Sequence, residues 1–311
     1  MLVVHHTFAD THGAPAPPIV PDMIGPMTWT VTGAAGMLGQ DLVEAARARG
    51  HEVVAVDRDE LDITDAAAVM DALGTPGGND VVINCAAWTQ VDSAEEREPL
   101  AFTLNAVGPQ NLAAACAASG ARFVQISTDY VFPGNGTSPY GEDDLLAPLG
   151  AYGRTKAAGE WAVRSQGVDF LIVRTAWLYG EHGNPFPKVM ARLLREKGHV
   201  DVVTDQVGQP TWTKDLADLI LRLVEGHAPS GIYHGTSSGQ CSWWEFTRAI
   251  AESIGVPVDA VGETTAAAFK RPAPRPAYSV LGHDALRRIG VEPIGDWKDR
   301  WEAAASSIVG D

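Results

Sequence analysis

The chain has 311 residues, of which 45% are hydrophobic and 20% are charged, and its formal net charge at pH 7 is −16. This length and balance are typical of a globular protein with one large domain or two domains. The acidic charge argues against a protein that binds nucleic acid, because such proteins need clustered Lys and Arg. No apolar run approaches the roughly 20 residues of a membrane span, so we expect no association with a membrane.

The first 26 residues and the three cysteines favour no special chemistry. Residues 1–26 are rich in proline, show no hydrophobic periodicity and lack the regions of a signal peptide, so we expect a poorly ordered extension. Cys85, Cys116 and Cys241 form no CxxC pair and have no histidine at ligand spacing. We therefore expect three buried thiols and a reducing, cytoplasmic location.

Strand and helix patterns alternate from residue 28 onward. We expect strands at 28–32, 51–57, 80–87, 121–128 and 168–177, the second of them buried, and helices at 36–50, 65–74, 98–119 and 152–165. Strands that alternate with helices of this length predict βαβ units around a parallel sheet. The fold class is therefore α/β, with a Rossmann-type, doubly wound parallel sheet.

The pattern loosens after residue 177. We expect further helices at 185–196, 213–226, 242–254 and 296–308, and a proline-rich connector at 271–279. Ser242 and Glu245 have the spacing of a capping box. We expect a dinucleotide-binding domain over 27–176. Segments around 200–236 are candidates for further parts of that domain. The rest of 177–311 is expected to be a smaller, mixed α/β substrate-binding domain.

A glycine-rich turn joins the first strand to the first helix. In "TVTGAAGMLGQDL", Gly33, Gly36 and Gly39 recur at three-residue intervals. Such glycines allow a tight turn, let the backbone approach a pyrophosphate and let the helix pack on the sheet. The helix N-terminus then offers free N–H groups to the phosphates. This pattern predicts a dinucleotide cofactor.

The second strand ends in Asp57, followed directly by Arg58. An acid here typically binds the ribose hydroxyls and favours NAD, whereas an arginine suits the 2′-phosphate of NADP. The residues therefore leave NADH and NADPH open.

Tyr152 and Lys156 are four residues apart, so they project from one face of the helix. We expect the ammonium, together with a nicotinamide, to lower the pKa of the phenol and make it a usable acid. The small neighbours Gly153, Ala157, Ala158 and Gly159 are expected to leave room for a cofactor.

Several separate motifs resemble those of the extended short-chain dehydrogenase/reductases, and more closely the dTDP-4-dehydrorhamnose reductases. They are "TGAAGMLG", "STDYVFPG", "YGRTKAAGE" and "RTAWLYG", joined by "NCAAWTQVDSAE" (84–95), "LNAVGPQNLA" (104–113), "NPFPKVM" (184–190) and "TDQVGQPTWTKDLA" (204–217). The resemblance runs from about residue 28 to the C-terminus.

The resemblance implies reduction of the C4 keto group of dTDP-4-dehydro-L-rhamnose to give dTDP-L-rhamnose for cell-wall polysaccharide. Tyr152 would donate the proton, Lys156 would bind the nicotinamide ribose, and Thr128 would hydrogen-bond the substrate oxygen. The resemblance also implies contacts with the cofactor: with the pyrophosphate by Gly36, Met37 and Leu38, with the ribose by Asp57, with the adenine by Asp62 and Ile63, and at the next strand end by Ala87, Trp88 and Thr89. For the substrate, it implies contacts with the sugar by Asp129 and Trp177, and near the nucleotide by Asn184, Phe186, Lys188, Gln206 and Gln209.

The chain departs from the family at one point. Some members have a magnesium site built from glutamates at a dimer interface, but the matching position holds Asp41, a shorter acid. Magnesium and that homodimer are both in question here, and we assign no metal ligand.

Alternative functions share the fold. A nucleotide-sugar dehydratase needs an Asp–Glu pair directly after the threonine, and the run Thr128–Asp129–Tyr130 lacks the glutamate. A reductase or epimerase of another nucleotide sugar stays open. A non-catalytic regulatory subunit stays open as well, because such relatives can keep the tyrosine and the lysine.

Overall fold

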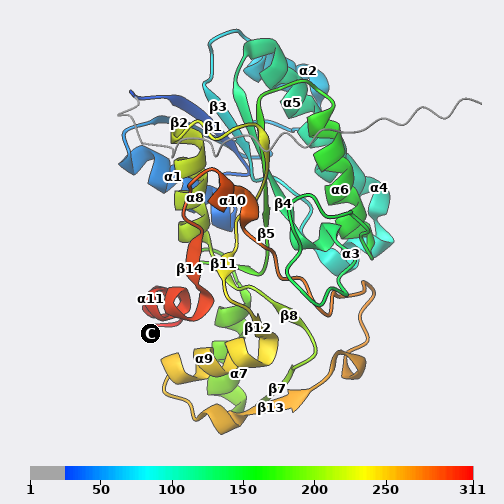
Figure 1. The fold of residues 1–311 in the computed structure, drawn as a ribbon, viewed down its shortest axis with the longest axis vertical. Coiled ribbons are helices and arrows are strands. Elements are labelled where there is room, and N and C mark those ends of the chain that lie inside the picture. Colours follow the sequence, from blue (N-terminus) through cyan, green and yellow to red (C-terminus); the bar gives the residue numbers. More distant parts are fainter. Residues whose placement is uncertain (1–24, 311) are drawn as a thin grey trace, which may run out of the picture.

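The computed structural model describes residues 25–310. A large sheet flanked by helices forms the upper part of the molecule in Figure 1, and small sheets with further helices form the lower part. Most of the extension expected at 1–26 lies outside the described residues. Among the described residues, no helix combines the length and the apolarity that crossing a membrane requires.

The large sheet has six parallel strands in the order β10-β5-β4-β3-β1-β2. Their bounds are β1 (Thr28–Thr32), β2 (Glu52–Val56), β3 (Val81–Asn84), β4 (Arg122–Thr128), β5 (Phe170–Thr175) and β10 (Gly231–His234). The chain runs from β1 outward to β2 and then returns to β3 on the other side of β1. This reversal is the switch point of a doubly wound sheet, where ligands bind beyond the carboxyl ends of the strands. The predicted fold class is confirmed.

Helices cover both faces of this sheet (Figure 1). Their bounds are α1 (Met37–Ala48) and α8 (Thr213–Glu225) on one face, and α2 (Ala66–Leu73), α5 (Gly108–Ser119) and α6 (Ala151–Arg164) on the other. Successive residues of β3 point to opposite faces, so Val82 joins one core cluster and Ile83 the other. A strand buried on both sides is typically rich in apolar residues, and β3 is apolar from Val81 to Ile83 before it ends in the buried Asn84.

The elements of the lower part come mostly from the second half of the chain. The helices are α7 (Phe186–Lys197), α9 (Trp243–Ser253) and α11 (Trp297–Val309); the strands are β6 (Leu178–Tyr179), β7 (Val200–Val203), β8 (Val207–Gly208), β9 (Thr211–Trp212), β11 (Ser237–Ser238), β12 (Cys241–Ser242), β13 (Val261–Thr264) and β14 (Ile294–Asp296). The short helix α10 (Asp284–Arg288) lies in the upper part, against β10 (Figure 1). The predicted capping box is confirmed, since Ser242 and Glu245 bond each other's backbone at the start of α9.

One predicted strand differs from the structure, and one short helix was missed. The strand expected to be buried over 51–57 is β2, which lies at the edge of the sheet with Val54 exposed. An edge strand and a central strand can have the same apolar sequence pattern. Their burial differs because it depends on how many neighbouring strands and helices cover them, which the pattern does not show. The short helix α3 (Val91–Glu96), between β3 and the next helix, was not predicted.

The single helix expected over 98–119 changes its hydrogen bonding on the way. It begins as α4 (Glu98–Phe102), passes through a π-helical turn (Thr103–Val107) and continues as α5. Such turns insert a residue into the helix and are frequent at functional sites. Here the turn contains Asn105, whose side chain bonds to Trp88 and Thr155.

Candidate active site

The glycine turn has the geometry of a phosphate-binding loop. Gly33 has φ +66°, and a Cβ there would lie 2.6 Å from the backbone nitrogen of Ala86. A Cβ at Gly39 would overlap the carbonyl oxygen of Gly33. Gly36 is the N-cap of α1 and provides no side-chain cap, so the first N–H groups of the helix stay available to an anion. The turn therefore fits the pyrophosphate of a dinucleotide.

Asp57 holds this turn in place. Its carboxylate accepts hydrogen bonds from the backbone N–H groups of Ala35 (3.0 Å) and Arg58 (2.8 Å). Asp57 lies one residue beyond the end of β2, beside the glycine turn. The acid therefore has a structural role in addition to the predicted contact with ribose.

The other predicted cofactor residues line the same edge of the sheet. Asp62 caps its own turn by accepting from Thr64, and Ile63 is buried against Gly108. Ala87 and Trp88 follow β3 and are half-buried, while Thr89 is exposed.

Asn105 fixes the loop after β3, and sequence reasoning missed it. Its side chain accepts from the backbone N–H of Trp88 (2.8 Å) and donates to the carbonyl of Trp88 (3.2 Å) and to the hydroxyl of Thr155 (3.1 Å). It thereby links the cofactor loop to α6. An asparagine inside an Ala-rich helix was the available signal.

Three residues of α6, one turn apart, face three consecutive residues at the end of β4. Lys156 Nζ donates to the carbonyl of Ile126 (2.6 Å), and Ser127 Oγ donates to Glu160 Oε1 (2.5 Å). Tyr152 interacts with the side chain of Thr128. The i, i+4, i+8 spacing makes this line of contacts possible. The predicted catalytic residues Thr128, Tyr152 and Lys156 are thus brought together.

The small residues around Tyr152 serve helix packing. A Cβ at Gly153 would overlap the carbonyl oxygen of Tyr130, and one at Gly159 would overlap that of Asn105. Ala157 is buried in a core cluster with Val131 and Leu281. At Gly153, Gly159 and Ala157 the expected room is filled by the protein itself, whereas the room expected at Ala158 stays a prediction.

Burial dominates the acidity of Tyr152. It raises the pKa of the phenol to about 12, against the hydrogen bond with Thr128, while the charge of Asp129 raises it further. The expected lowering by Lys156 is absent among the interactions of the described residues, since the lysine's ammonium points to the carbonyl of Ile126. Tyr152 is therefore held as a neutral phenol with a proton to give.

Burial also acts on the two neighbours of Tyr152. Lys156 is 4% exposed, and desolvation lowers its pKa to about 8, with the charge of Glu160 opposing that shift. Asp129 is buried, and desolvation raises its pKa to about 6, opposed by the nearby hydroxyls of Ser279 and Thr128, of which Thr128 donates a hydrogen bond. Both groups titrate close to neutrality.

A buried ion pair supports the end of α6. Arg174 on β5 bonds both carboxylate oxygens of Glu160, at 2.9 and 2.7 Å. Arg174 also donates to the carbonyl of Glu142 (3.0 Å) and lies over the ring of Phe132. A bidentate pair of this kind is directional and fixes α6 against the sheet.

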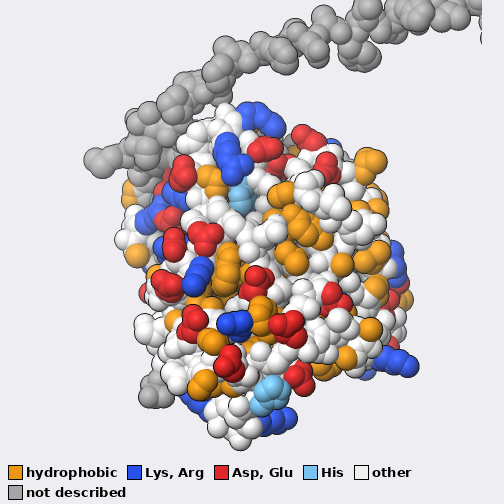
Figure 2. All heavy atoms as spheres, turned by 60° about the horizontal axis from the view of Figure 1, so that its bottom comes forward, with side chains coloured by type: hydrophobic (Ala, Val, Ile, Leu, Met, Phe, Trp, Pro, Cys, Tyr) orange, Lys and Arg blue, Asp and Glu red, His pale blue; other side chains and the backbone are white. Residues whose placement is uncertain are grey.

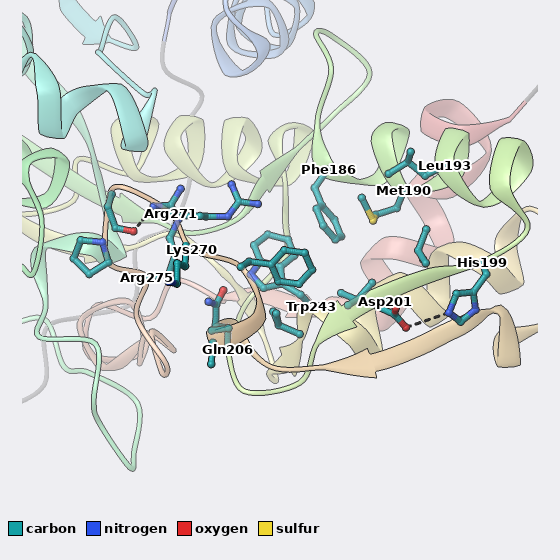
Figure 3. Close-up of a pocket in the computed structure, with 18 of the residues that line it drawn as sticks. Phe186, Met190, Leu193, His199, Asp201, Gln206, Trp243, Lys270, Arg271 and Arg275 are labelled. Atoms are coloured by element: carbon teal, nitrogen blue, oxygen red, sulfur yellow. Dashed lines mark hydrogen bonds and ion pairs between the residues drawn. The ribbon is translucent and has the colours of Figure 1, made fainter.

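A cavity of about 1100 Å³ opens beside this line of residues, with Tyr130 in its wall. Tyr130 packs edge-on against Tyr152, with ring centroids 5.5 Å apart. Figure 3 shows three basic side chains, Lys270, Arg271 and Arg275, grouped on one side of the Trp243 ring. His199 and Asp201 lie at the opposite end. The cavity therefore has a basic end and an aromatic middle.

The basic residues were missed because 271–279 was interpreted only as a connector and Lys270, directly before it, was not considered. The three basic residues within "KRPAPRP" (270–276) were the available signal. The face drawn in Figure 2 gives no such signal, since Lys and Arg are interspersed with Asp and Glu over it.

The predicted substrate residues separate into two groups. Phe186 and Gln206 line the cavity. Asn184 is exposed, Lys188 donates to the carbonyl of Glu181, and Gln209 bonds the backbone of Leu281 through both ends of its amide. Hydrogen bonding within the protein therefore already engages Lys188 and Gln209.

Trp177 packs against Trp243, which lines the cavity. It has φ +46°, and its ring stacks on that of Trp243 with centroids 3.5 Å apart. A Cβ at Gly208 would lie 2.5 Å from the Trp177 indole. Trp243, and not Trp177, is the tryptophan of this pair that lines the cavity.

Asp41 does not make a metal site with its neighbours. Its carboxylate is fully buried in α1, and the nearest imidazole nitrogen, on His182, is 3.8 Å away. Residues 25–310 contain no group of three or more His, Cys, Asp or Glu side chains that is arranged to hold an ion. A magnesium site shared between two chains stays a prediction.

Comparisons with known proteins agree with this geometry. The model of the family "RmlD substrate binding domain" matches residues 27–309. The chain is 48% identical over 275 residues to a dTDP-4-dehydrorhamnose reductase of Streptomyces griseus, covering 87% of this chain and 90% of that protein. It is 46% identical over 274 residues to a dTDP-4-keto-6-deoxy-D-glucose reductase of Streptomyces niveus, covering 86% and 93%.

A solved structure has the same fold over nearly its whole length. It is a dTDP-4-dehydrorhamnose reductase of Bacillus anthracis in complex with NADP, with a TM-score of 0.86, 37% identity and coverage of 90% of this chain and 99% of that one. The predicted family is confirmed: the chain belongs to the RmlD substrate binding domain family.

Proposed function

We propose that the chain is an NAD(P)H-dependent oxidoreductase that reduces the C4 keto group of dTDP-4-dehydro-L-rhamnose to dTDP-L-rhamnose, the last step of dTDP-rhamnose biosynthesis. The observation that carries the proposal is the junction of two features. The protonated phenol of Tyr152 stands at the carboxyl edge of a dinucleotide-binding sheet, and a cavity with a basic end opens next to it. The family and the names of the relatives support the choice of substrate.

The chain's residues supply the proton for this reduction. A reduced nicotinamide, when bound, supplies the hydride that forms the new bond to C4. The electrons of the carbonyl double bond then move to its oxygen, and Tyr152 gives that oxygen its phenolic proton. A phenol with a pKa of about 12 is fully protonated at neutral pH and well matched to a developing alkoxide.

Neighbouring groups would place the substrate and the cofactor. Thr128, on the same edge as Tyr152, would hydrogen-bond the substrate oxygen, and Asp129 would contact the sugar. Lys156 would turn part of its hydrogen bonding from Ile126 to the nicotinamide ribose; an ammonium has three donors, so both partners can be served. The glycine turn and the start of α1 would hold the pyrophosphate.

The cavity suits the nucleotide part of the substrate. Lys270, Arg271 and Arg275 would bind the diphosphate, because guanidinium groups match phosphate oxygens in charge and geometry. The rings of Trp243 and Phe186, 4.3 Å apart, offer flat apolar surface to a base. These assignments extend the predicted set, in which Phe186 and Gln206 already belong to the nucleotide end.

Several finer predictions stay open. Asp57 accepts bonds from two backbone N–H groups and keeps lone pairs for ribose hydroxyls, while exposed Arg58 favours a 2′-phosphate, so NADH and NADPH both remain candidates. A homodimer, magnesium and a cytoplasmic location stay predictions. The domain division at 176 also does, although β10 and α8 on the large sheet support a return of the chain around 200–236.

A second substrate has specific support. The relative from Streptomyces niveus is named for dTDP-4-keto-6-deoxy-D-glucose and is nearly as similar as the rhamnose-pathway relative. Both substrates carry a C4 ketone on a dTDP sugar, so the same residues serve either, and the stereochemistry of the sugar would distinguish them.

The test is a parallel assay. The purified protein is mixed with each of the two ketosugars and with NADH or NADPH, and cofactor oxidation and the sugar product are followed. Faster turnover of dTDP-4-dehydro-L-rhamnose supports the proposal. Faster turnover of the D-glucose derivative selects the second candidate, and binding of cofactor without oxidation in any mixture favours a regulatory subunit.

A further inference from the structure

The motif "VDSAE" (91–95) has no role in the reaction described so far. It forms most of α3, directly after the loop that lines the cofactor. Its two acids, Asp92 and Glu95, are three residues apart and contact two different parts of the site. We define the basic strap as residues 270–275, the segment that carries Lys270, Arg271 and Arg275.

One carboxylate of α3 contacts the basic strap at three residues. Asp92 Oδ1 lies 2.9 Å from a terminal nitrogen of Arg275, and Oδ2 lies 3.6 Å from a terminal nitrogen of Arg271. The backbone N–H of Ala273 donates to Oδ1 over 3.3 Å. These partners are about 180 residues away in the sequence, so the contact joins separate parts of the chain. All three strap residues line the cavity.

The neighbouring acid ties α3 to the catalytic helix. Glu95 Oε1 accepts the backbone N–H of Ala151, the first residue of α6, over 2.7 Å. A Cβ at Gly150 would lie 2.5 Å from Glu95 Oε1 and 3.5 Å from Pro274 of the strap. The strap, α3 and the start of α6 thus meet at one point, and Tyr152 is the second residue of that helix.

We propose that Asp92 is a positioning residue for the anionic part of the substrate: it holds Arg271 and Arg275 in the cavity wall at a fixed distance from Tyr152. The proposal rests on the function proposed above. Asp92 contacts one terminal nitrogen of each arginine, and a guanidinium has five N–H donors, so other donors remain for phosphate oxygens. Fixing two long side chains before the ligand arrives reduces the entropy that binding loses.

The opposite role for Asp92 makes a different prediction. A carboxylate that merely occupied the arginines would compete with the diphosphate, and its removal would tighten binding. Asp92 contacts Arg271 and Arg275 but does not itself line the cavity, which is the arrangement expected of a support. The sign of the change in affinity therefore decides between the two roles.

The experiment compares the binding of dTDP and of thymidine, measured by calorimetry, to the wild type and to Asp92→Asn. The asparagine keeps one oxygen for the N–H of Ala273 and loses the charge together with the second acceptor oxygen. We expect the dissociation constant of dTDP to rise about five-fold and that of thymidine to stay unchanged. In the reductase assay, KM for the nucleotide sugar should rise to a similar extent while kcat is retained.

Three further variants complete the test. Asp92→Glu restores the charge and should recover part of the affinity for dTDP. In an Arg275→Gln background, Asp92→Asn should have a smaller effect, because Asp92 acts through that arginine. Asp169→Asn is the matched control, since Asp169 pairs with Arg122 (2.8 Å) at the opposite, amino end of the strands and should leave dTDP binding unchanged.

The proposal is overturned if Asp92→Asn binds dTDP as well as or better than the wild type, or if dTDP and thymidine weaken equally. A wild type that binds neither compound overturns the proposed function itself and this inference with it. A wild type that binds dTDP and an unaffected variant overturn the inference alone.

Discussion

The catalytic edge and the cavity beside it are built in contrasting ways. At the edge, Thr128 and Lys156 are buried, and α6 meets β4 through hydrogen bonds at consecutive residues. In the cavity, Arg271 and Lys270 are exposed, and the strap is held by a few partly exposed ion pairs. Chemistry demands sub-ångström placement, whereas binding of a flexible nucleotide tolerates adjustment. Substitutions at the edge should therefore lower kcat, and substitutions in the cavity should raise KM.

The largest effect is expected for Tyr152→Phe. Removing the proton donor should lower kcat by about 10²- to 10⁴-fold while the affinity for the cofactor stays the same. Steady-state kinetics and cofactor titration measure both. Tyr233→Phe, which loses a hydroxyl bonded to Pro229, is the control and should keep normal kcat. Retained turnover in Tyr152→Phe would remove the tyrosine from its proposed role.

Glu160→Gln tests how much the buried ion pair between Arg174 and Glu160 contributes to stability. It leaves Arg174 buried without its carboxylate, so we expect a loss of about 3 kcal/mol in the free energy of unfolding. Chemical denaturation measures the loss. Glu98→Gln breaks the exposed pair with Arg154 and should cost less than about 1 kcal/mol. Equal losses in the two variants would contradict the contrast between buried and exposed pairs.

The pH dependence of kcat/KM for the cofactor should report the ionisation of Lys156 at the catalytic edge. The pKa of Lys156 is lowered to about 8, so its ammonium is lost as the pH rises through that value. If the ammonium binds the cofactor, kcat/KM for the cofactor should fall by about tenfold per pH unit above pH 8, since this ratio reports groups of the free enzyme. Glu160 and Cys85 are the charged and titratable groups that act on Lys156. A profile that stays flat to pH 10 would rule out this role.

Trp243→Ala probes the cavity. It removes one of the two rings that offer flat surface to a base and also the partner of Trp177. We expect KM for the nucleotide sugar to rise about tenfold with kcat little changed, since an aromatic contact contributes about 0.5–1.5 kcal/mol. Trp244→Ala is the adjacent control, because Trp244 bonds Val261 and lies outside this cavity. A fall in kcat alone would contradict the division of labour between the two regions.

The same contrast explains what could be predicted from the sequence. Gly33, Tyr152 and the alternation of strands are local patterns whose spacing follows from turn and helix geometry, so the sheet and the catalytic pair were predictable. The basic strap depends on a contact between Asp92 and Arg275, far apart in the chain, and spacing contains no information about it.

The errors have physical causes of the same kind. The edge position of β2 depends on strand order, which periodicity does not encode. Gly153 and Gly159 contact backbone of other elements, and no local pattern distinguishes packing glycines from glycines that leave space. The lowering of the Tyr152 pKa expected from Lys156 is not found, because burial raises that pKa and the ammonium is bonded to the carbonyl of Ile126. Both the burial and the direction of the ammonium emerge only from the tertiary fold.

The most direct test of the central claim is a single turnover of dTDP-4-dehydro-L-rhamnose with NADPH or NADH in which both hydrogens at C4 of the nicotinamide are deuterium. Mass spectrometry and NMR of the product locate the label. We predict dTDP-L-rhamnose with one deuterium at C4 of the sugar in the wild type and almost none formed by Tyr152→Phe. Product without deuterium at C4, or no product although cofactor and ketosugar both bind, would contradict direct hydride transfer at this edge.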